Sequence, residues 1–167
     1  MMLDLDALRK RHDALPEWLA DALASYAALA LQRRHQPGVI LSLMVGGNQV
    51  DEFLIWRTRP STTTVDDKRA TEDGAECVAL AIVGQHRRWQ IIRRLQSVRG
   101  EGADWLMRDI DSGGDIVLEI SGTDEGAFEP RVRKKRAQAN LAARWGTPAV
   151  SVVRFFEPKA ILDGGAE

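Results

Sequence analysis

The segment from Asp115 to Ser121 constrains the fold more than any other part of this sequence. It reads Asp-Ile-Val-Leu-Glu-Ile-Ser, so polar and apolar side chains alternate along it. Because successive side chains of a strand point to opposite faces, the pattern predicts a strand with Glu119 and Ser121 on one face. A carboxylate between Leu118 and Ile120 is costly to bury unless it is protonated, paired or bound to a cation. Glu119 therefore predicts a polar partner or a cation beside this strand.

The elements expected around this strand follow a definite order along the chain. Hydrophobic periodicity and turn residues predict a helix, three strands, a helix and a strand, over 66–83, 88–95, 103–109, 115–121, 130–145 and 150–156. Ahead of them we expect a helical segment over 2–34 and a β-hairpin over 39–45 and 50–58. The sequence thus predicts one α/β (α+β) domain over 1–167. Its expected parts are N-terminal helices and a hairpin (1–60), an αβββαβ core (66–157) and a flexible tail (158–167).

Other carboxylates are expected near Glu119 in this arrangement. Asp104 falls early in the preceding strand, and Glu72 and Glu76 are four residues apart on one helix face. Oxygen ligands from adjacent strands suit Mg²⁺, which keeps several waters and needs only one or two carboxylates. A thiolate or histidine site is not expected, because the chain has one Cys and three His without ligand spacing. We therefore expect a Mg²⁺ or Mn²⁺ site, with Asp104, Glu119, Glu76 and Glu72 as candidate ligands.

The spacing of the two strand acids resembles a known motif. Gly102-Ala103-Asp104, then fourteen residues, then Glu119-Ile120-Ser121 resembles the PD-(D/E)XK nuclease core, the restriction-endonuclease-like fold. The resemblance covers about residues 66–157. It implies that Asp104 and Glu119 are the two motif acids, and that Glu72 or Glu76 is the glutamate that some members carry on the first helix.

Ser121 stands where this family usually has its lysine, and a hydroxyl cannot supply the charge of that lysine. Some members recruit the missing group from the following helix, so the resemblance makes Lys134, Lys135 and Gln138 candidates. Helical spacing puts Lys134 and Gln138 on one face, four residues apart. The candidate catalytic residues are therefore Asp104, Glu119, Lys134 and Gln138.

The activity that the resemblance implies is metal-dependent hydrolysis of phosphodiester bonds in DNA or RNA. The net charge of -1 conceals a polarised chain, because residues 85–99 and 131–136 contain 10 of the 23 basic residues. Arginine presents a planar fork that matches phosphate, so these stretches predict a nucleic-acid partner. The candidate contacts are Arg87, Arg88, Arg93, Arg94, Arg131, Arg133 and Lys135.

Each of these signals also has a purely structural interpretation. Asp104 could cap a turn after Gly102, and Glu119 could pair across the sheet with an arginine such as Arg93. The helix glutamates and the run over 131–136 could be solvated helix faces. The alternative function is a catalytically inactive nuclease-fold module that binds nucleic acid or a protein partner.

The remaining expectations concern the N-terminal segment and the location of the protein. The helices and hairpin could form a contact with a protein partner or a second copy, with Trp18, Phe53 and Trp56 as anchors. The longest uncharged apolar stretch, around Val39 to Val45, is too short to span a bilayer, so no membrane association is expected. The acidic start differs from the basic start of a signal peptide, and we expect a cytoplasmic protein.

Overall fold

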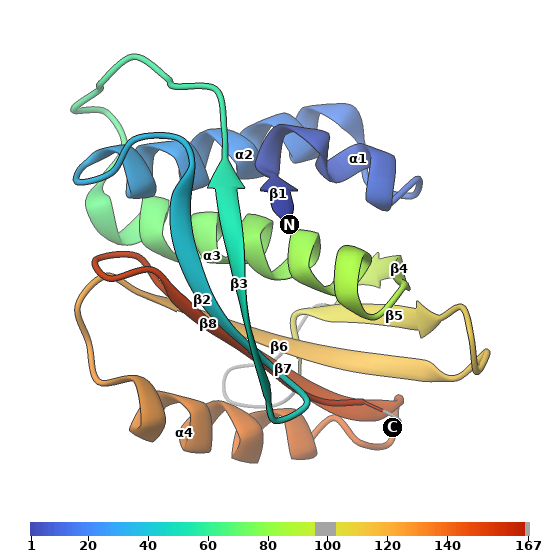
Figure 1. Ribbon diagram of the computed structural model, residues 1–167. Coiled ribbons are helices and arrows are strands. Elements are labelled where there is room, and N and C mark those ends of the chain that lie inside the picture. Colours follow the sequence, from blue (N-terminus) through green and yellow to red (C-terminus); the bar gives the residue numbers. More distant parts are fainter. Residues whose placement is uncertain (96–102, 166–167) are drawn as a thin grey trace.

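The computed structural model describes residues 1–95 and 103–165 and contains one eight-stranded mixed sheet (Figure 1). The strand order is β1-β3-β2-β8-β7-β6-β5-β4. The strands are β1 (Met2–Asp4), β2 (Val39–Val45), β3 (Asn48–Ile55), β4 (Trp89–Arg94), β5 (Trp105–Asp109), β6 (Asp115–Thr123), β7 (Thr147–Arg154) and β8 (Lys159–Gly164). The helices are α1 (Leu8–Arg11), α2 (Glu17–Gln32), α3 (Asp67–His86) and α4 (Phe128–Asn140), with a 3₁₀ turn at Leu5–Ala7.

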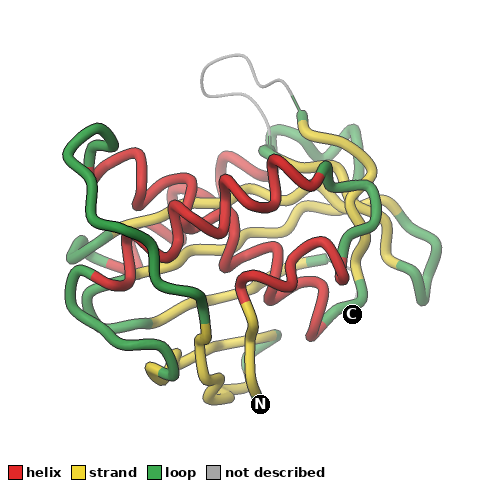
Figure 2. The backbone as a smooth tube through the Cα atoms, turned by 90° about the horizontal axis from the view of Figure 1, so that it is seen from above, coloured by secondary structure: helices red, strands yellow, loops and turns green. Residues whose placement is uncertain are grey.

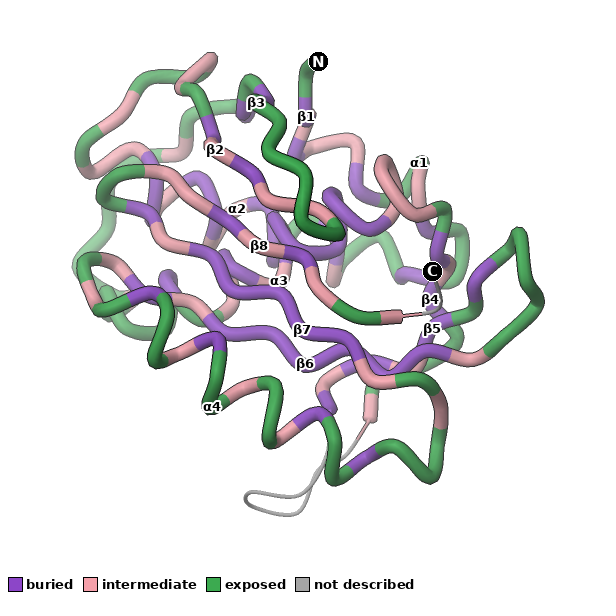
Figure 3. Tube along the Cα trace, turned by 60° about the horizontal axis from the view of Figure 1, so that its bottom comes forward, coloured by how far each residue is buried: buried purple, intermediate pink, exposed green. Residues whose placement is uncertain are grey.

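The helices cover the two faces of the sheet unequally. Figure 1 shows α1, α2 and α3 on one face and α4 on the other, and Figure 2 shows the sheet running beneath the helices when seen from above. β6 and β7 lie between α3 and α4 and are buried along almost their whole length (Figure 3). The two strands pair in parallel because α4 carries the chain back between them.

The α/β class and the expected order of the second half are confirmed. α3, β4, β5, β6, α4 and β7 follow one another as helix, three antiparallel strands, helix and strand. The hairpin of β2 and β3 is confirmed as well. Gly46 and Gly47 form its turn with positive φ angles of 53° and 81°, a backbone that glycine adopts readily.

α3 is the central helix because small residues let it approach its neighbours on both sides. A Cβ atom on Gly74 would lie 2.9 Å from the Ala27 Cα of α2, and one on Gly122 of β6 would lie 2.4 Å from the Thr71 carbonyl oxygen. Glycine at these two positions therefore allows α3 to pack closely against both α2 and β6. This packing brings the first half of α3 to the edge of the sheet where β5 begins.

Two predictions for the ends of the chain were wrong. Residues 2–34 are not one helical segment, because Met2–Asp4 pairs in parallel with β3 and Pro16 marks the start of α2. Residues 159–164 are not a flexible tail. They form β8, which pairs with both β7 and β2, and bury Ala160 and Leu162 completely. β8 thereby joins the hairpin and the predicted core into one sheet.

Smaller differences concern the basic helix and the residues outside the described ranges. α4 begins at Phe128 and ends at Asn140, and turns rather than helix follow up to residue 145. The predicted Gly102 of the motif, residues 96–99 of the first basic stretch and the last two residues lie outside the described residues.

Candidate functional site

A hollow of about 340 Å³ lies where α3, the start of β5, β6 and α4 meet. We call it the carboxylate hollow, and its principal lining residues are Glu72, Glu76, Asp104, Glu119, Ser121 and Lys135. It brings together all four carboxylates that the sequence predicts as metal ligands. Asp73, Arg131 and Lys134 also line it.

Glu119 is the most deeply buried acid of this hollow, with 6% of its side chain exposed. Its Oε1 atom accepts a hydrogen bond of 2.7 Å from the Lys135 ammonium group, and the carboxyl group of Asp104 is close enough to perturb its pKa. Burial and the neighbouring charge of Asp104 raise the pKa of Glu119 to about 7, although Lys135 acts in the opposite direction. Glu119 is therefore a paired carboxyl with an adjacent like charge.

Asp104 comes immediately before β5 and extends the pairing between β5 and β6. Its backbone N–H donates to the Leu118 carbonyl, and its Oδ2 atom accepts a hydrogen bond of 2.7 Å from the Ile120 N–H. Burial also raises the pKa of Asp104. The backbone of β6 thus holds the Asp104 carboxyl beside Glu119.

The glutamates of α3 reach the hollow in different states. Glu76 is mostly buried, and its Oε2 atom accepts hydrogen bonds from Arg94 at 2.5 Å and from the Trp105 indole at 3.2 Å. Burial raises its pKa. Glu72 is exposed and lies 4.0 Å from Lys68.

The arrangement fits a cation held by two carboxylates. Among residues 1–95 and 103–165, no group of three Asp, Glu, His or Cys side chains is assembled closely enough to hold a metal. Buried Glu119 and half-buried Asp104 are nevertheless adjacent carboxyls, and a divalent cation would offset the repulsion between their charged forms. Mg²⁺ needs only one or two protein carboxylates, so this pair is a chemically suitable donor set.

Three polar side chains of α4 lie on one helix face, which differs from the face of Lys134 and Gln138 expected from the sequence. Arg131, Lys135 and Gln138 follow at spacings of four and three residues. Arg131 Nη1 donates to the Ser121 hydroxyl at 3.1 Å, Lys135 binds Glu119, and Gln138 has a buried Oε1 atom without a hydrogen-bond partner in the described chain. Lys134 lines the hollow but is exposed. The lysine in contact with the acids is therefore Lys135 rather than Lys134.

The other predicted basic residues are distributed over separate places. Arg87 and Arg88 line a different hollow at the C-terminal end of α3, where Arg88 pairs with Asp111 at 2.6 Å. Arg94 stacks over the Trp105 ring while it pairs with Glu76. Arg93 and Arg133 are exposed, and Glu119 pairs with Lys135 rather than with Arg93. Of the seven predicted contacts, Arg131 and Lys135 line the carboxylate hollow.

One acid of the site, Asp73, was not predicted from the sequence. Asp73 lines the hollow and is paired with Arg69 at 2.6 Å. Its position between Glu72 and Glu76, four residues after an arginine, was the available signal.

The predicted anchors of a protein contact differ in exposure. Trp18 and Phe53 are exposed, whereas Trp56 is 5% exposed and belongs to the core. Within the described ranges, no helix has both the length and the apolar character needed to cross a bilayer.

Comparison of the chain with protein-family models, curated proteins and solved structures gave no match. The function is therefore inferred from the carboxylate hollow itself.

Proposed function

We propose that the protein is a Mg²⁺- or Mn²⁺-dependent nuclease that hydrolyses phosphodiester bonds of DNA or RNA on a restriction-endonuclease-like core. The observation that carries the proposal is the pair of carboxyls formed by buried Glu119 and half-buried Asp104, with the Lys135 ammonium group 2.7 Å from Glu119. Paired carboxyls with raised pKa values in a hollow are typical of functional sites.

The proposed core is supported by the order and pairing of its elements. β4, β5 and β6 form an antiparallel meander after α3, and α4 leads to β7, which is parallel to β6. The two motif acids fall just before β5 and within β6, and Glu76 of α3 lines the same hollow. This agreement extends over the same residues as the sequence resemblance.

Each side chain has a distinct part in the proposed reaction. Asp104 and Glu119 hold the cation, which when bound polarises the phosphoryl group and lowers the pKa of a coordinated water. The hydrogen bond from the Ile120 N–H fixes the Asp104 carboxyl before substrate arrives. Lys135 stabilises the negative charge that develops on the phosphate, which is the contribution that Ser121 cannot make.

The direct test is incubation with single- and double-stranded DNA and RNA in Mg²⁺ or Mn²⁺. The native protein is compared with Asp104→Ala, Glu119→Ala and, as a control, Glu129→Ala, an exposed acid that pairs with Lys159 at 3.6 Å. We expect cleavage by the native protein and the control and at least a hundredfold loss in the other two variants. Native activity no greater than that of Asp104→Ala and Glu119→Ala would sink the enzyme proposal.

A second candidate is a catalytically inactive module that binds nucleic acid or a protein. It is favoured by Ser121 at the position of the motif lysine and by the ion pair that already balances Glu119. This candidate predicts binding that does not depend on a divalent cation and is unaffected by Glu119→Ala. The two candidates are separated by measuring binding and cleavage on the same substrates.

A further inference from the structure

A second hollow of about 350 Å³ adjoins the carboxylate hollow and shares Glu72, Gly122 and Arg131 with it. We call it the arginine hollow, and its principal lining residues are Arg33, Lys68, Thr71, Thr123, Asp124 and Arg131. Thr71 of α3 lines the arginine hollow, and Glu76 of the same helix lines the carboxylate hollow. The two residues are five positions apart, which corresponds to about 7.5 Å along the helix axis. The hollows are therefore close enough for one extended ligand to occupy both.

Arg131 lies at the junction of the two hollows and has most of its hydrogen-bonding capacity unused. A guanidinium group carries five N–H donors. Within the described residues, the Ser121 hydroxyl is its one hydrogen-bond acceptor, and no carboxylate forms an ion pair with it. Its Nε–H has no partner but is buried, so an anion would be bound through the other guanidinium nitrogens. A partly buried guanidinium without an anionic partner is a suitable binding group for a phosphate.

The other charges of the arginine hollow are already balanced. Arg33 lies 3.4 Å from an Asp67 carboxylate oxygen and 3.9 Å from one of Asp124, and Lys68 lies 4.0 Å from Glu72. Arg131 is the cation left over from this pairing in the part of the chain that the structure describes. An incoming anion would therefore meet Arg131 without displacing an existing ion pair.

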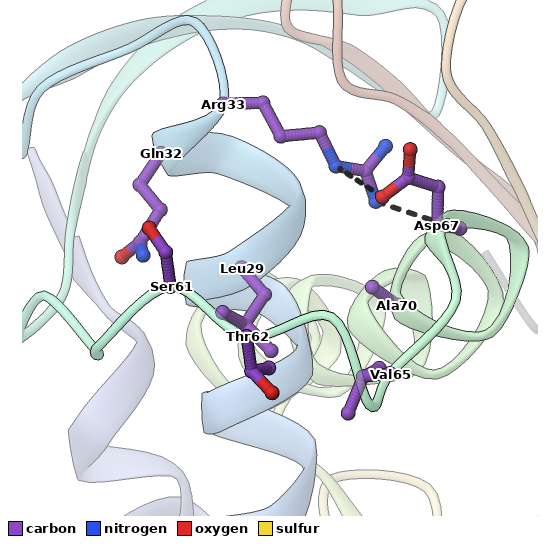
Figure 4. Close-up of a pocket in the computed structure, with 8 residues that line it drawn as sticks. All are labelled: Leu29, Gln32, Arg33, Ser61, Thr62, Val65, Asp67 and Ala70. Atoms are coloured by element: carbon purple, nitrogen blue, oxygen red, sulfur yellow. Dashed lines mark hydrogen bonds and ion pairs between the residues drawn. The ribbon is translucent and has the colours of Figure 1, made fainter.

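The arginine hollow is bounded on its far side by the contact between Arg33 and Asp67. Figure 4 shows this pair beside a third hollow, which is lined by Leu29, Val65 and Ala70. The amide of Gln32, which also lines it, is bound to the backbone of Arg59 through both its oxygen and its nitrogen. Arg131 thus lines the two hollows nearest the carboxylates and not the third.

We infer that the arginine hollow is a second phosphate subsite, in which Arg131 binds the phosphate next to the one at Asp104 and Glu119. The inference rests on the proposed function, because both phosphates belong to the same nucleic-acid strand. It specifies the substrate class: the protein acts on a polynucleotide with at least two consecutive phosphates and uses an isolated phosphodiester poorly. Ser121 then has a positioning role, since its hydroxyl holds the Arg131 guanidinium between the two hollows.

The test measures binding of a short fluorescent oligonucleotide in EDTA, where cleavage cannot occur. The variants are Arg131→Gln, Arg131→Lys and a control, Arg144→Gln, which removes an exposed arginine outside both hollows. We expect Arg131→Gln to raise Kd about tenfold. It should also reduce the slope of log Kd against log salt concentration by about one, which is the change expected for the loss of one phosphate contact. Arg131→Lys should restore most of the affinity, which shows that a loss in Arg131→Gln is not misfolding. Equal Kd values for Arg131→Gln and Arg144→Gln, or no binding by the native protein, would overturn the inference.

Cleavage assays distinguish this inference from the proposed function. Arg131→Gln should raise KM for the oligonucleotide by a much larger factor than it changes the slow hydrolysis of bis(4-nitrophenyl) phosphate, which has a single phosphate. If the native protein cleaves neither substrate but Arg131→Gln still weakens binding selectively, the proposed nuclease fails and the phosphate subsite stands. If cleavage depends on Glu119 but not on Arg131, the subsite fails and the nuclease stands.

Discussion

Two glutamates are almost completely buried in the described part of the chain, and they lie in opposite electrostatic surroundings. Glu52 of β3 has 2% of its side chain exposed and lies 2.8 Å from His86 Nε2, 3.3 Å from the Gln85 amide nitrogen and 3.6 Å from the N-terminal amino group. Glu119 has one close cation, Lys135, and a second carboxyl, that of Asp104, beside it. Burial alone therefore does not identify a functional acid. The presence of a neighbouring like charge is what distinguishes the carboxylate hollow from the structural cluster around Glu52.

The largest expected effect concerns the pH dependence of stability. The pKa of Glu119 rises from 4.5 to about 7 on folding, so between these pH values the native protein holds a proton that the unfolded chain has lost. The free energy of unfolding should therefore fall as pH rises through this window, by at most about 3 kcal/mol, and level off above it. Glu119→Gln removes this titration and should lack the loss.

Urea unfolding of the native protein, Glu119→Gln and Glu52→Gln from pH 4.5 to 8 measures this effect. As pH rises through this window, the free energy of unfolding of the native protein should fall relative to that of Glu119→Gln. Glu52→Gln is the matched substitution at the other buried glutamate. A constant difference between native protein and Glu119→Gln at every pH would show that Glu119 titrates normally.

The next effect separates the two neighbouring lysines of α4. Lys135→Gln should lower the rate of phosphodiester cleavage about a hundredfold, because it removes the charge beside Glu119. Lys134→Gln should have a much smaller effect, since Lys134 lines the hollow but is exposed. Steady-state cleavage of one labelled oligonucleotide by both variants gives the ratio directly. Equal losses would assign both lysines the same general electrostatic role.

The smallest effect is the structural cost of altering Glu52. Glu52→Gln should lower the free energy of unfolding by about 2 kcal/mol, because it replaces a buried carboxylate that contacts His86 and accepts a hydrogen bond from Gln85. Its cleavage activity per folded molecule should equal that of the native protein. Denaturant unfolding and activity assays at a temperature well below the transition measure both quantities. An activity loss comparable to that of Glu119→Ala would remove the distinction between the two buried acids.

The parts of the fold that follow from local patterns could be predicted from the sequence. The alternation in β6, the turn at Gly46-Gly47 and the periodicity of α3 are properties of short segments, and each of these elements lies where it was expected. β8 was missed because a six-residue strand that ends in glycines is stabilised by β2 and β7, which are distant in sequence. β1 was missed for the same reason, since its partner is β3.

The candidate site was predictable in its acids but not in its cations. Asp104 and Glu119 are brought together by strand register, which the alternation of β5 and β6 fixes. The choice between Lys134 and Lys135 depends on the rotation of α4 about its axis, which the burial of Val132 and Ala139 determines. Arg87 lies fifteen residues after Glu72, which corresponds to about 22 Å along α3, so Arg87 and Arg88 lie far from the carboxylate hollow.

Binding of Mn²⁺ at pH 8, followed by isothermal titration calorimetry, tests most directly whether the Asp104 and Glu119 pair is a cation site. The native protein and Glu52→Gln should each bind a single Mn²⁺ with the same affinity. Glu119→Gln should weaken this binding at least tenfold, because one of the two charged ligands is lost. Equal Mn²⁺ affinities of the native protein and Glu119→Gln, or no binding by the native protein, would contradict the assignment of the paired carboxyls as a metal site.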